Sequence, residues 1–478
     1  MRTVLLFIVI ALTAAAESGP ATWNAKTLWE AWPAVRVSPA DPWAVKHSDL
    51  RSALAGLQSR HPGLATIAAE GLSSEGRPIP LLRVGAGPTG ILLWSQMHGD
   101  EPAATAALLD LLNWLGAHRA DPTVQRILSG LTLWIIPMLN PDGTERTQRR
   151  NAQEIDINRD ALRLASPEAR FLKAARERAQ PALGFNLHNQ NPMLRAGREG
   201  AQAAISVLSV PGDDADSITP GTRRTRQLAV LTRQLAETYA PGRVARYDTE
   251  YTERAFGDSM TRWGTATLLV ETGGWSGPDE SARLVRLNFV VLAGALAALA
   301  DGSLDRIDSA AYDRIPLNER DAMDTLVVRN VRLASGRGLP PFAADLAFVV
   351  PDPFTGGSGH RREPALTDLG DLSATLGLAE IDAKGMLAVP WPELKTVKDW
   401  PALKAALTAK SLAVTEEGRL RTALHAQGEA AAAKPGYTGP VLLYRTDAIG
   451  RLRLESAILQ GRWVGDAGAA APSSPTNR

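Results

Sequence analysis

The feature that most constrains the fold of this chain is a series of short apolar segments that alternate with helical patterns. The segments occupy residues 90–96, 131–139, 182–188 and 265–274, and most of their positions are apolar. Strands of this kind are typical of a sheet that is buried on both faces. Residues 102–119 show the helical spacing of apolar side chains. The alternation predicts an α/β fold with a mixed, largely parallel sheet and helices on both faces.

The pattern changes after residue 302, where Gly- and Pro-rich breaks separate strand-like segments such as "DTLVVRNVRLASG" and "RLRLESAILQGRWV". At 478 residues the chain is long enough for two domains. We therefore predict an α/β domain at 46–302 and a smaller β-rich C-terminal domain at 303–464. The composition of the tail at 465–478 is typical of disorder.

The N-terminus has the composition of an export signal. Arg2 precedes the apolar run "VLLFIVIAL", and "AAAE" offers a small-residue cleavage site. We expect cleavage after Ala16 and a secreted or periplasmic protein with no further membrane span, with an uncleaved anchor as the alternative. Residues 17–45 then form an N-terminal extension, and their pattern leaves open whether it is a pro-segment.

Charge and cysteine content narrow the classes of partner and of ligand. The formal net charge is +1, so no strong field attracts nucleic acid or an anionic membrane, and we expect no nucleic-acid partner. The sequence has no cysteine, although export implies an oxidising compartment. A zinc-like ion would therefore be held by histidine and carboxylate side chains.

Polar residues follow several of the predicted strands. "GILLWSQ" ends at "MHGDEP", and two later strands end at "HNQN" and "ETGG". Ligands in open α/β sheets bind at the carboxyl ends of strands, where His98, Glu101, His188 and Glu271 would converge. Two histidines and a glutamate form a zinc ligand set of hydrolases. We predict that His98, Glu101 and His188 hold one Zn²⁺ ion and that Glu271 takes a proton from the water that the ion activates.

Each of these motifs has a simpler explanation when it stands alone. The carboxylates of "HGDE" can cap the helix that follows, and His188 can be a buried, hydrogen-bonded histidine. The hypothesis depends on the side chains meeting at one edge of the sheet. The polar segment 140–160 is either a solvated loop or, beside a metal site, a source of arginines suited to binding a carboxylate or a developing oxyanion.

Five motifs occur in a characteristic order: "HGDE", "NPDG", "NAQEIDINRD", "NLH" and "LLVETGG". With them the chain resembles the zinc metallocarboxypeptidase family, which includes carboxypeptidases A and B, over about residues 45–300. The resemblance implies that His98, Glu101 and His188 are zinc ligands and that Glu271 is the general base and acid.

The segment "NAQEIDINRD" and the arginines before it match further residues of the family. The resemblance implies that Asn158 and Arg159 bind the C-terminal carboxylate of the substrate. Arg149 best matches the arginine that supports the oxyanion, and Arg150 is the neighbouring alternative. Asp156 matches the carboxylate that orients the first zinc histidine, as ligands of this kind usually require.

The substrate and one site residue stay open at this point. The family's active-site tyrosine corresponds to Tyr247 or to Tyr251. The resemblance implies a carboxypeptidase, but the short interval between the zinc histidines is nearer to the family's deacylase branch. The partner is then a peptide, a cell-wall peptide or an acyl amino acid with a free carboxylate. A non-catalytic binding protein on the same scaffold is a third hypothesis. The C-terminal part resembles the β-domain that flanks metal-dependent amidohydrolases. Because the histidines of a catalytic amidohydrolase do not follow it, we expect an accessory β-domain, with a β-rich module of unrelated ancestry as the alternative.

Overall fold

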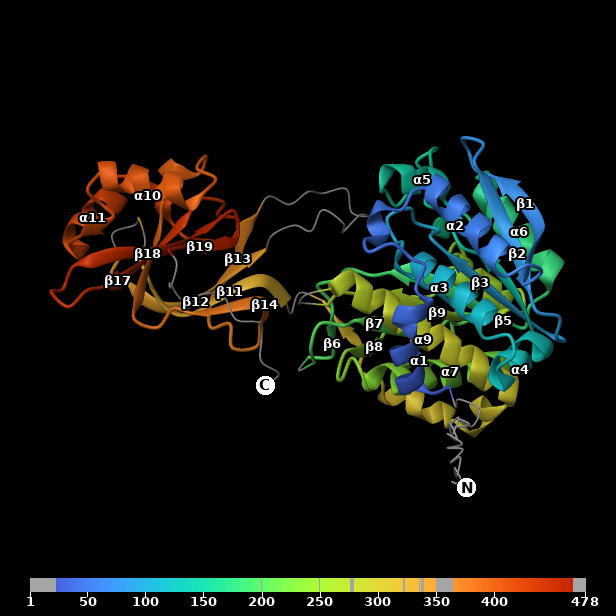
Figure 1. The fold of residues 1–478 in the computed structure, drawn as a ribbon. Helices are drawn as coiled ribbons and strands as arrows, with labels where there is room; N and C mark the ends of the chain where they lie inside the picture. The colour runs from blue at the N-terminus through green and yellow to red at the C-terminus, as the bar shows by residue number, and fades with distance from the viewer. Residues whose placement is uncertain are drawn as a thin grey trace, which may run out of the picture.

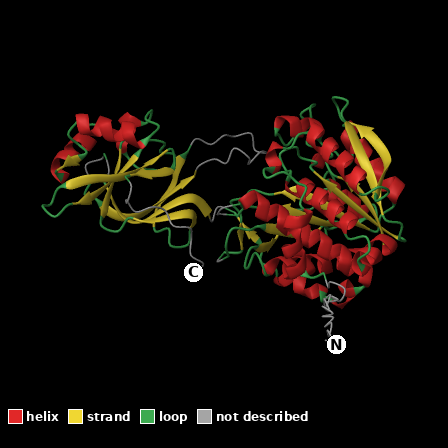
Figure 2. Ribbon diagram, in the orientation of Figure 1, coloured by secondary structure: helices red, strands yellow, loops and turns green. Residues whose placement is uncertain are grey.

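The computed structural model describes residues 23–198, 200–248, 250–275, 279–320, 323–334, 336, 339–349 and 364–466. The predicted signal peptide at 1–16 and nearly all of the predicted tail lie outside the described residues, so both stay predictions. Two bodies of secondary structure follow one another along the chain, one rich in helices around a sheet and one dominated by strands (Figure 1, Figure 2).

The first body is built on an eight-stranded mixed sheet. Its strands are β1 (Ala65–Leu72), β2 (Pro78–Val84), β3 (Thr89–Ser95), β4 (Leu131–Ile136), β5 (Leu183–Asn189), β7 (Ile205–Ser209), β8 (Val244–Arg246) and β9 (Ala266–Thr272). They lie in the order β1-β2-β4-β3-β5-β9-β7-β8, and the central strands β4, β3, β5 and β9 are parallel. Antiparallel pairs join β1 to β2, β2 to β4 and β7 to β9.

Alternate residues of the central strands face two different cores. On β3, Ile91 and Leu93 belong to one core, and Leu92 and Trp94 belong to the other. The first core is covered by α1 (Ala25–Val35), α2 (His47–Arg60), α3 (Ala103–Ala117), α4 (Pro122–Gly130), α7 (Pro220–Glu237) and α9 (Glu280–Asp301). The second is covered by α6 (Pro167–Ala179), α8 (Phe256–Arg262) and the 3₁₀ turn η2 (Ile157–Arg159). Helices on both faces of a mixed, mostly parallel sheet confirm the predicted fold class.

The N-terminal strap, which we define as residues 23–45, is packed into the first core. Leu28, Trp32 and Val35 of α1 are buried there. The strap continues through the 3₁₀ turn η1 (Pro42–Ala44), which packs against α3. The fully buried carboxylate of Asp110 on α3 accepts hydrogen bonds from Trp32 Nε1, from Val37 N, and from both N and Oγ of Ser38, at 2.8–2.9 Å.

Helix α9 is the only helix of the described residues that is long and apolar enough to cross a membrane. However, 78% of its apolar window is buried within the protein. It packs against α1, α3, α4 and α7. We therefore assign it to the core of the first body.

The second body is a separate β-rich region, as predicted for the C-terminal part. Its nine-stranded sheet is formed by β11 (Met323–Leu333), β12 (Phe342–Val349), β13 (Ala365–Gly370), β14 (Leu376–Asp382), β15 (Met386–Pro390), β16 (Val414–Thr415), β17 (Val441–Thr446), β18 (Leu452–Leu459) and β19 (Arg462–Gly465). Helices α10 (Trp400–Ala409) and α11 (Glu417–His425) and the turns η5 (Pro392–Leu394) and η6 (Gly428–Ala431) contribute to one of its cores.

Short elements occupy the connection between the two bodies. The turns η3 (Ser303–Arg306) and η4 (Ser309–Arg314) supply Leu304 and Tyr312 to the first core. Strand β10 (Asn318–Glu319) then pairs with β6 (Arg195–Ala196). The domain limits inferred from composition stay a prediction.

Candidate metal centre and active site

The first two candidate ligands lie in the turn that follows β3, and the "NPDG" motif holds this turn. The motif opens helix α5 (Pro141–Arg146). Asn140 accepts a hydrogen bond from Gly143 N at 2.9 Å and donates from Nδ2 to Met97 O at 3.3 Å. A Cβ built on Gly99 would lie 2.0 Å from the carbonyl carbon of Gly143, so only glycine allows this close approach. The two motifs are therefore packed backbone against backbone.

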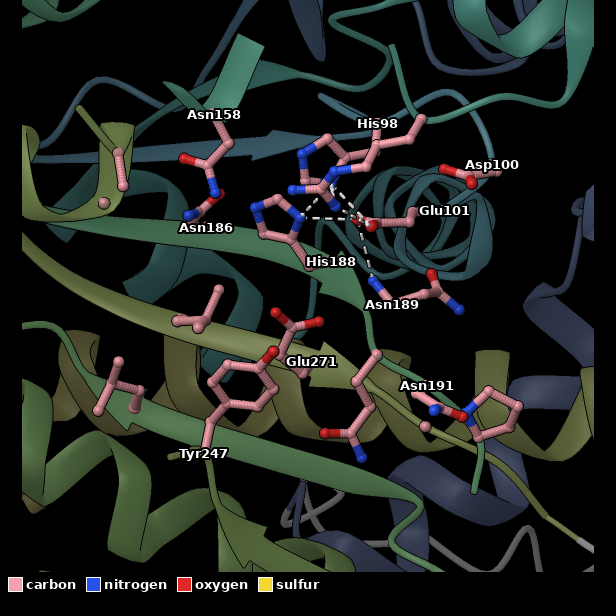
Figure 3. Close-up of a pocket in the computed structure, with 18 of the residues that line it drawn as sticks. His98, Asp100, Glu101, Asn158, Asn186, His188, Asn189, Asn191, Tyr247 and Glu271 are labelled. Carbon is pink, nitrogen blue, oxygen red and sulfur yellow. Dashed lines mark hydrogen bonds and ion pairs between the residues drawn. The ribbon is translucent and has the colours of Figure 1, made fainter. Parts of the chain in front are cut away.

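His98, Glu101 and His188 meet in one buried cluster (Figure 3). The Oε1 of Glu101 lies 2.7 Å from Nδ1 of His98, and its Oε2 lies 2.6 Å from Nδ1 of His188. The two Nδ1 atoms are 3.2 Å apart. The structure thus brings together three side chains that come from the turn after β3 and from the end of β5.

The geometry and the charge of this cluster fit a zinc ion. Zinc bonds of about 2.0–2.1 Å in tetrahedral geometry place neighbouring ligand atoms roughly 3.3 Å apart, close to the spacing of the two Nδ1 atoms. Burial opposes ionisation of Glu101, but the two histidines outweigh it and lower the pKa of its carboxyl group. Burial lowers the pKa of His188, which favours the neutral form that a metal requires. For His98, burial lowers the pKa, but Glu101 and Asp156 together raise it more, so the pKa of His98 is raised overall. The cluster therefore attracts positive charge.

Asp156 and Arg149 lie behind the cluster. The Nε2 of His98 lies within hydrogen-bond distance of Oδ1 of Asp156, at 3.2 Å, and its Nδ1 faces the cluster, 3.0 Å from Nη1 of Arg149. Arg149 donates a hydrogen bond from Nε to Oδ2 of Asp156 at 3.1 Å, and its Nη2 forms an ion pair with the same oxygen at 3.0 Å. Burial works against ionisation of Asp156, but these partners prevail and lower its pKa. Such outer carboxylates orient a ligating imidazole.

Glu271 lies beside the cluster because of strand register. It is the register partner of His188 across the parallel pair β5 and β9. Leu187 and Val270, the preceding residues, face the first core, so His188 and Glu271 point to the opposite face. Figure 3 shows the carboxylate of Glu271 between His188 and Tyr247.

Burial gives Glu271 the character of a proton acceptor. It is 7% exposed, and its Oε2 has no hydrogen-bond partner among the described residues. Burial, reinforced by the negative charge of Glu101, raises the pKa of Glu271 to about 8. Burial and the charge of Glu271 raise the pKa of Tyr247 to about 12, so this phenol stays protonated and can donate. A carboxyl group with a pKa near neutrality is suited to general base and acid catalysis.

All of these side chains line one cavity of about 760 Å³. Asn158 and Arg159, from η2, line it too. The Oδ1 of Asn158 accepts from Phe256 N at 2.9 Å, which fixes the amide. Arg159 is exposed and donates to the carbonyl of Asn158 at 2.7 Å. A carboxylate in this part of the cavity would therefore meet a fixed amide and an exposed guanidinium.

The sequence left open which of two tyrosines and which of two neighbouring arginines belongs to the site, and the members of each pair differ in their position relative to the cavity. Tyr247 lines the cavity, whereas the hydroxyl of Tyr251 donates to Gly212 O at 3.4 Å and the side chain is not among the lining residues. Arg149 lines the cavity, whereas Arg150 is exposed and donates to Glu154 O. The geometry therefore favours Tyr247 and Arg149 as residues that can touch a substrate.

Sequence reasoning missed several residues that line the cavity. Asn186 precedes His188 by two residues on β5 and so faces the same side. Asp258 lies in the first turn of α8, and burial raises the pKa of its carboxyl group to about 6. Asp41 and Trp43 come from the N-terminal strap. Strand periodicity could have identified Asn186, but no local pattern points to the strap.

The chain is similar to known proteins over part of its length. The family described as "Zinc carboxypeptidase" matches residues 50–189. The chain is 32% identical over 121 residues to "Carboxypeptidase SOL1" of Arabidopsis thaliana, which is 24% of this chain and 25% of that protein. It is 36% identical over 109 residues to "Carboxypeptidase D" of Mus musculus, which is 18% of this chain and 8% of that protein. The matches thus span at most about a quarter of these two relatives.

Among the solved structures that the chain matches is the "Metallo-carboxypeptidase from Pseudomonas Aeruginosa in complex with (2-guanidinoethylmercapto)succinic acid". Its TM-score is 0.41 at 24% identity, over 52% of this chain and 69% of that one. His98, Glu101, Asp156 and His188 fall inside the matched residues 50–189, while Glu271 lies beyond them. The family match therefore does not extend to Glu271, which the register of β5 and β9 and the cavity lining place beside the cluster.

Proposed function

We propose that the protein is a zinc-dependent carboxypeptidase that hydrolyses the last peptide bond of its substrates, because residues 50–189 match the zinc carboxypeptidase family. The observation that carries the proposal is the buried cluster of His98, Glu101 and His188 with Glu271 beside it in the same cavity. A zinc ion held by this cluster would supply a Lewis acid that polarises the scissile carbonyl and lowers the pKa of water.

Three side chains of the cavity supply the proton transfer, the charge stabilisation and the hydrogen bonding of the proposed reaction. Glu271 accepts the proton of the attacking water and returns it to the leaving amine, since its raised pKa suits both transfers. Arg149, next to the cluster, stabilises the negative charge that develops on the carbonyl oxygen. Tyr247 donates a hydrogen bond at the edge of the reaction zone.

Asn158 and Arg159 hold the free carboxylate of the substrate. The amide of Asn158 is fixed by Phe256 N, and the guanidinium of Arg159 can form two parallel bonds to a carboxylate. Binding the carboxylate here orients the last peptide bond toward the cluster. This arrangement selects substrates with an unblocked C-terminus.

The purified protein is expected to contain one zinc ion per chain and to release the C-terminal residue of peptides. A chelator should abolish release, and added zinc should restore it. Metal analysis and a panel of free peptides, their C-terminal amides and N-acyl amino acids test this directly. Faster hydrolysis of N-acyl amino acids would replace the peptidase by a deacylase. Bound zinc without hydrolysis of any substrate would favour a binding protein.

Arg159→Ala is expected to raise the KM for free-C-terminus peptides about 10–100-fold, since a charged hydrogen bond contributes about 1.5–3 kcal/mol. Hydrolysis of the matching peptide amides, which is slow at the outset, should change little. Arg163→Ala removes an exposed arginine that does not line the cavity and serves as the control. An equal loss on free and amidated peptides would argue against a carboxylate-binding role for Arg159.

A further inference from the structure

The N-terminal strap forms part of the wall of the active-site cavity. Asp41 and Trp43 line the cavity, although they lie outside the residues that match the family. The turn η1 packs against α3, and Lys46 just beyond it donates from Nζ to the carbonyls of Thr144 and Glu145 on α5, at 3.0 and 3.2 Å. Helices α3 and α5 flank the turn with His98 and Glu101, so the strap borders the cavity on the side of this turn.

Asp100 lies in the same turn and is a buried carboxylate without a partner. It is 3% exposed, and neither carboxylate oxygen has a hydrogen-bond partner among the described residues. It lines the cavity. Figure 3 shows Asp100 and Asn191 on one side of the metal cluster and Asn158 on the other. A buried carboxylate is costly until it meets a donor.

The arginines of the cavity have other partners, although Arg149 is close enough to Asp100 to lower the pKa of that carboxyl group. The guanidinium of Arg149 is bonded to Asp156, whose Oδ1 accepts from Asn158 N. Arg159 bonds to the carbonyl of Asn158. Arg320, the third lining arginine, is close enough to Tyr247 to affect the pKa of that phenol. The strap and the metal-binding turn therefore contribute two carboxyl groups, of Asp41 and Asp100, and the aromatic ring of Trp43 to the cavity wall.

We propose that Asp41, Trp43 and Asp100 form a subsite for a cationic side chain of the substrate, in the residues that precede the scissile bond. This subsite rests on the proposed function, because it assumes that the C-terminal carboxylate binds on the side of Asn158. The peptide then crosses the cluster, and its upstream residues reach the opposite side. A lysine or arginine there pairs with the two carboxylates and lies against the indole ring of Trp43.

The test compares peptides that share one cleavable C-terminal residue and have Lys-Lys, Gln-Gln or Glu-Glu before it. In Asp41→Asn the side chain still accepts from Trp43 N, as Asp41 does at 3.0 Å, so only the charge is removed. Asp41→Lys reverses the charge. Glu30→Lys makes the same reversal on an exposed residue of the strap outside the cavity and is the matched control. Binding of the same peptides to zinc-loaded Glu271→Gln protein is measured by calorimetry.

We expect the Lys-Lys peptide to exceed the Glu-Glu peptide about tenfold in kcat/KM. This ratio should fall about threefold in Asp41→Asn and further in Asp41→Lys. It should also fall with added salt, because Asp41 is exposed and its interactions are screened. Glu30→Lys should leave the ratio unchanged. A general structural defect would instead lower both peptides equally.

The possible outcomes separate the subsite from the activity. If no peptide is hydrolysed but the calorimetric preference for Lys-Lys depends on Asp41 as described, the subsite stands and the peptidase proposal fails. If peptides are hydrolysed with the same Lys-Lys to Glu-Glu ratio in the unmodified protein and in Asp41→Lys, the subsite is overturned and the peptidase stands. Absence of both hydrolysis and preferential binding overturns both.

Discussion

Glu271→Gln is expected to lower kcat by about 10²–10⁴-fold, the usual contribution of a general base. Glutamine has the same shape as glutamate but cannot accept the proton of water at neutral pH. The change also removes a buried carboxyl group whose pKa burial raises to about 8, so the folded protein should lose no stability. Turnover, zinc content and melting temperature of the variant would be measured together.

The control for this experiment is Glu253→Gln. Glu253 is an exposed glutamate that pairs with Arg262 at 2.6 Å and does not line the cavity. Its replacement should leave turnover and zinc content unchanged. Retention of full turnover by Glu271→Gln would remove this residue from the reaction. Loss of zinc together with turnover would instead assign it to metal binding.

Asp110→Ala is expected to destabilise the first body by about 3–5 kcal/mol. The carboxylate of Asp110 is fully buried and accepts four hydrogen bonds from Trp32, Val37 and Ser38 of the strap. Alanine leaves these donors unpaired, and each unsatisfied buried group costs about 1–3 kcal/mol. Calorimetry should show a melting temperature lower by roughly 8–15 °C.

Asp121→Asn is the matched control for Asp110. Asp121 also accepts from backbone N–H groups, those of Thr123 and Val124, but at the start of α4, where asparagine caps a helix as well as aspartate does. Its effect should be under about 0.5 kcal/mol. A wild-type melting temperature for Asp110→Ala would mean that the strap is not anchored through this side chain. The expected loss of stability would show that the strap is an integral part of the fold.

The central part of the site could be predicted because it obeys a simple topological rule. His98, His188 and Glu271 each follow or end an apolar segment that is readily identified, and parallel strands bring such ends to one edge of the sheet. Side-chain alternation then selects the face on which His188 and Glu271 lie together. The mixed α/β fold follows from the same segments.

The remaining features depend on contacts between distant parts of the chain. Asp110 looks like an ordinary polar position of an amphipathic helix, and only the packed strap explains its burial. Asp41 and Trp43 reach the cavity because α1 is anchored on α3 and α9. Tyr247 and Tyr251 are equivalent by spacing and differ only in the course of the chain after β8. Local periodicity contains no information on such contacts.

The contact between Gly99 and Gly143 has a consequence for how this protein can change over generations. A larger residue at Gly99 would press on the backbone of Gly143 and displace the turn that sets the spacing of His98 and Glu101. A larger residue at Gly143 would press on Asn140 and on the carbonyl of Arg150. Substitutions at these two positions are therefore expected to be disfavoured. New substrate preferences should arise from the strap and the outer loops, while the metal-binding turn stays as it is.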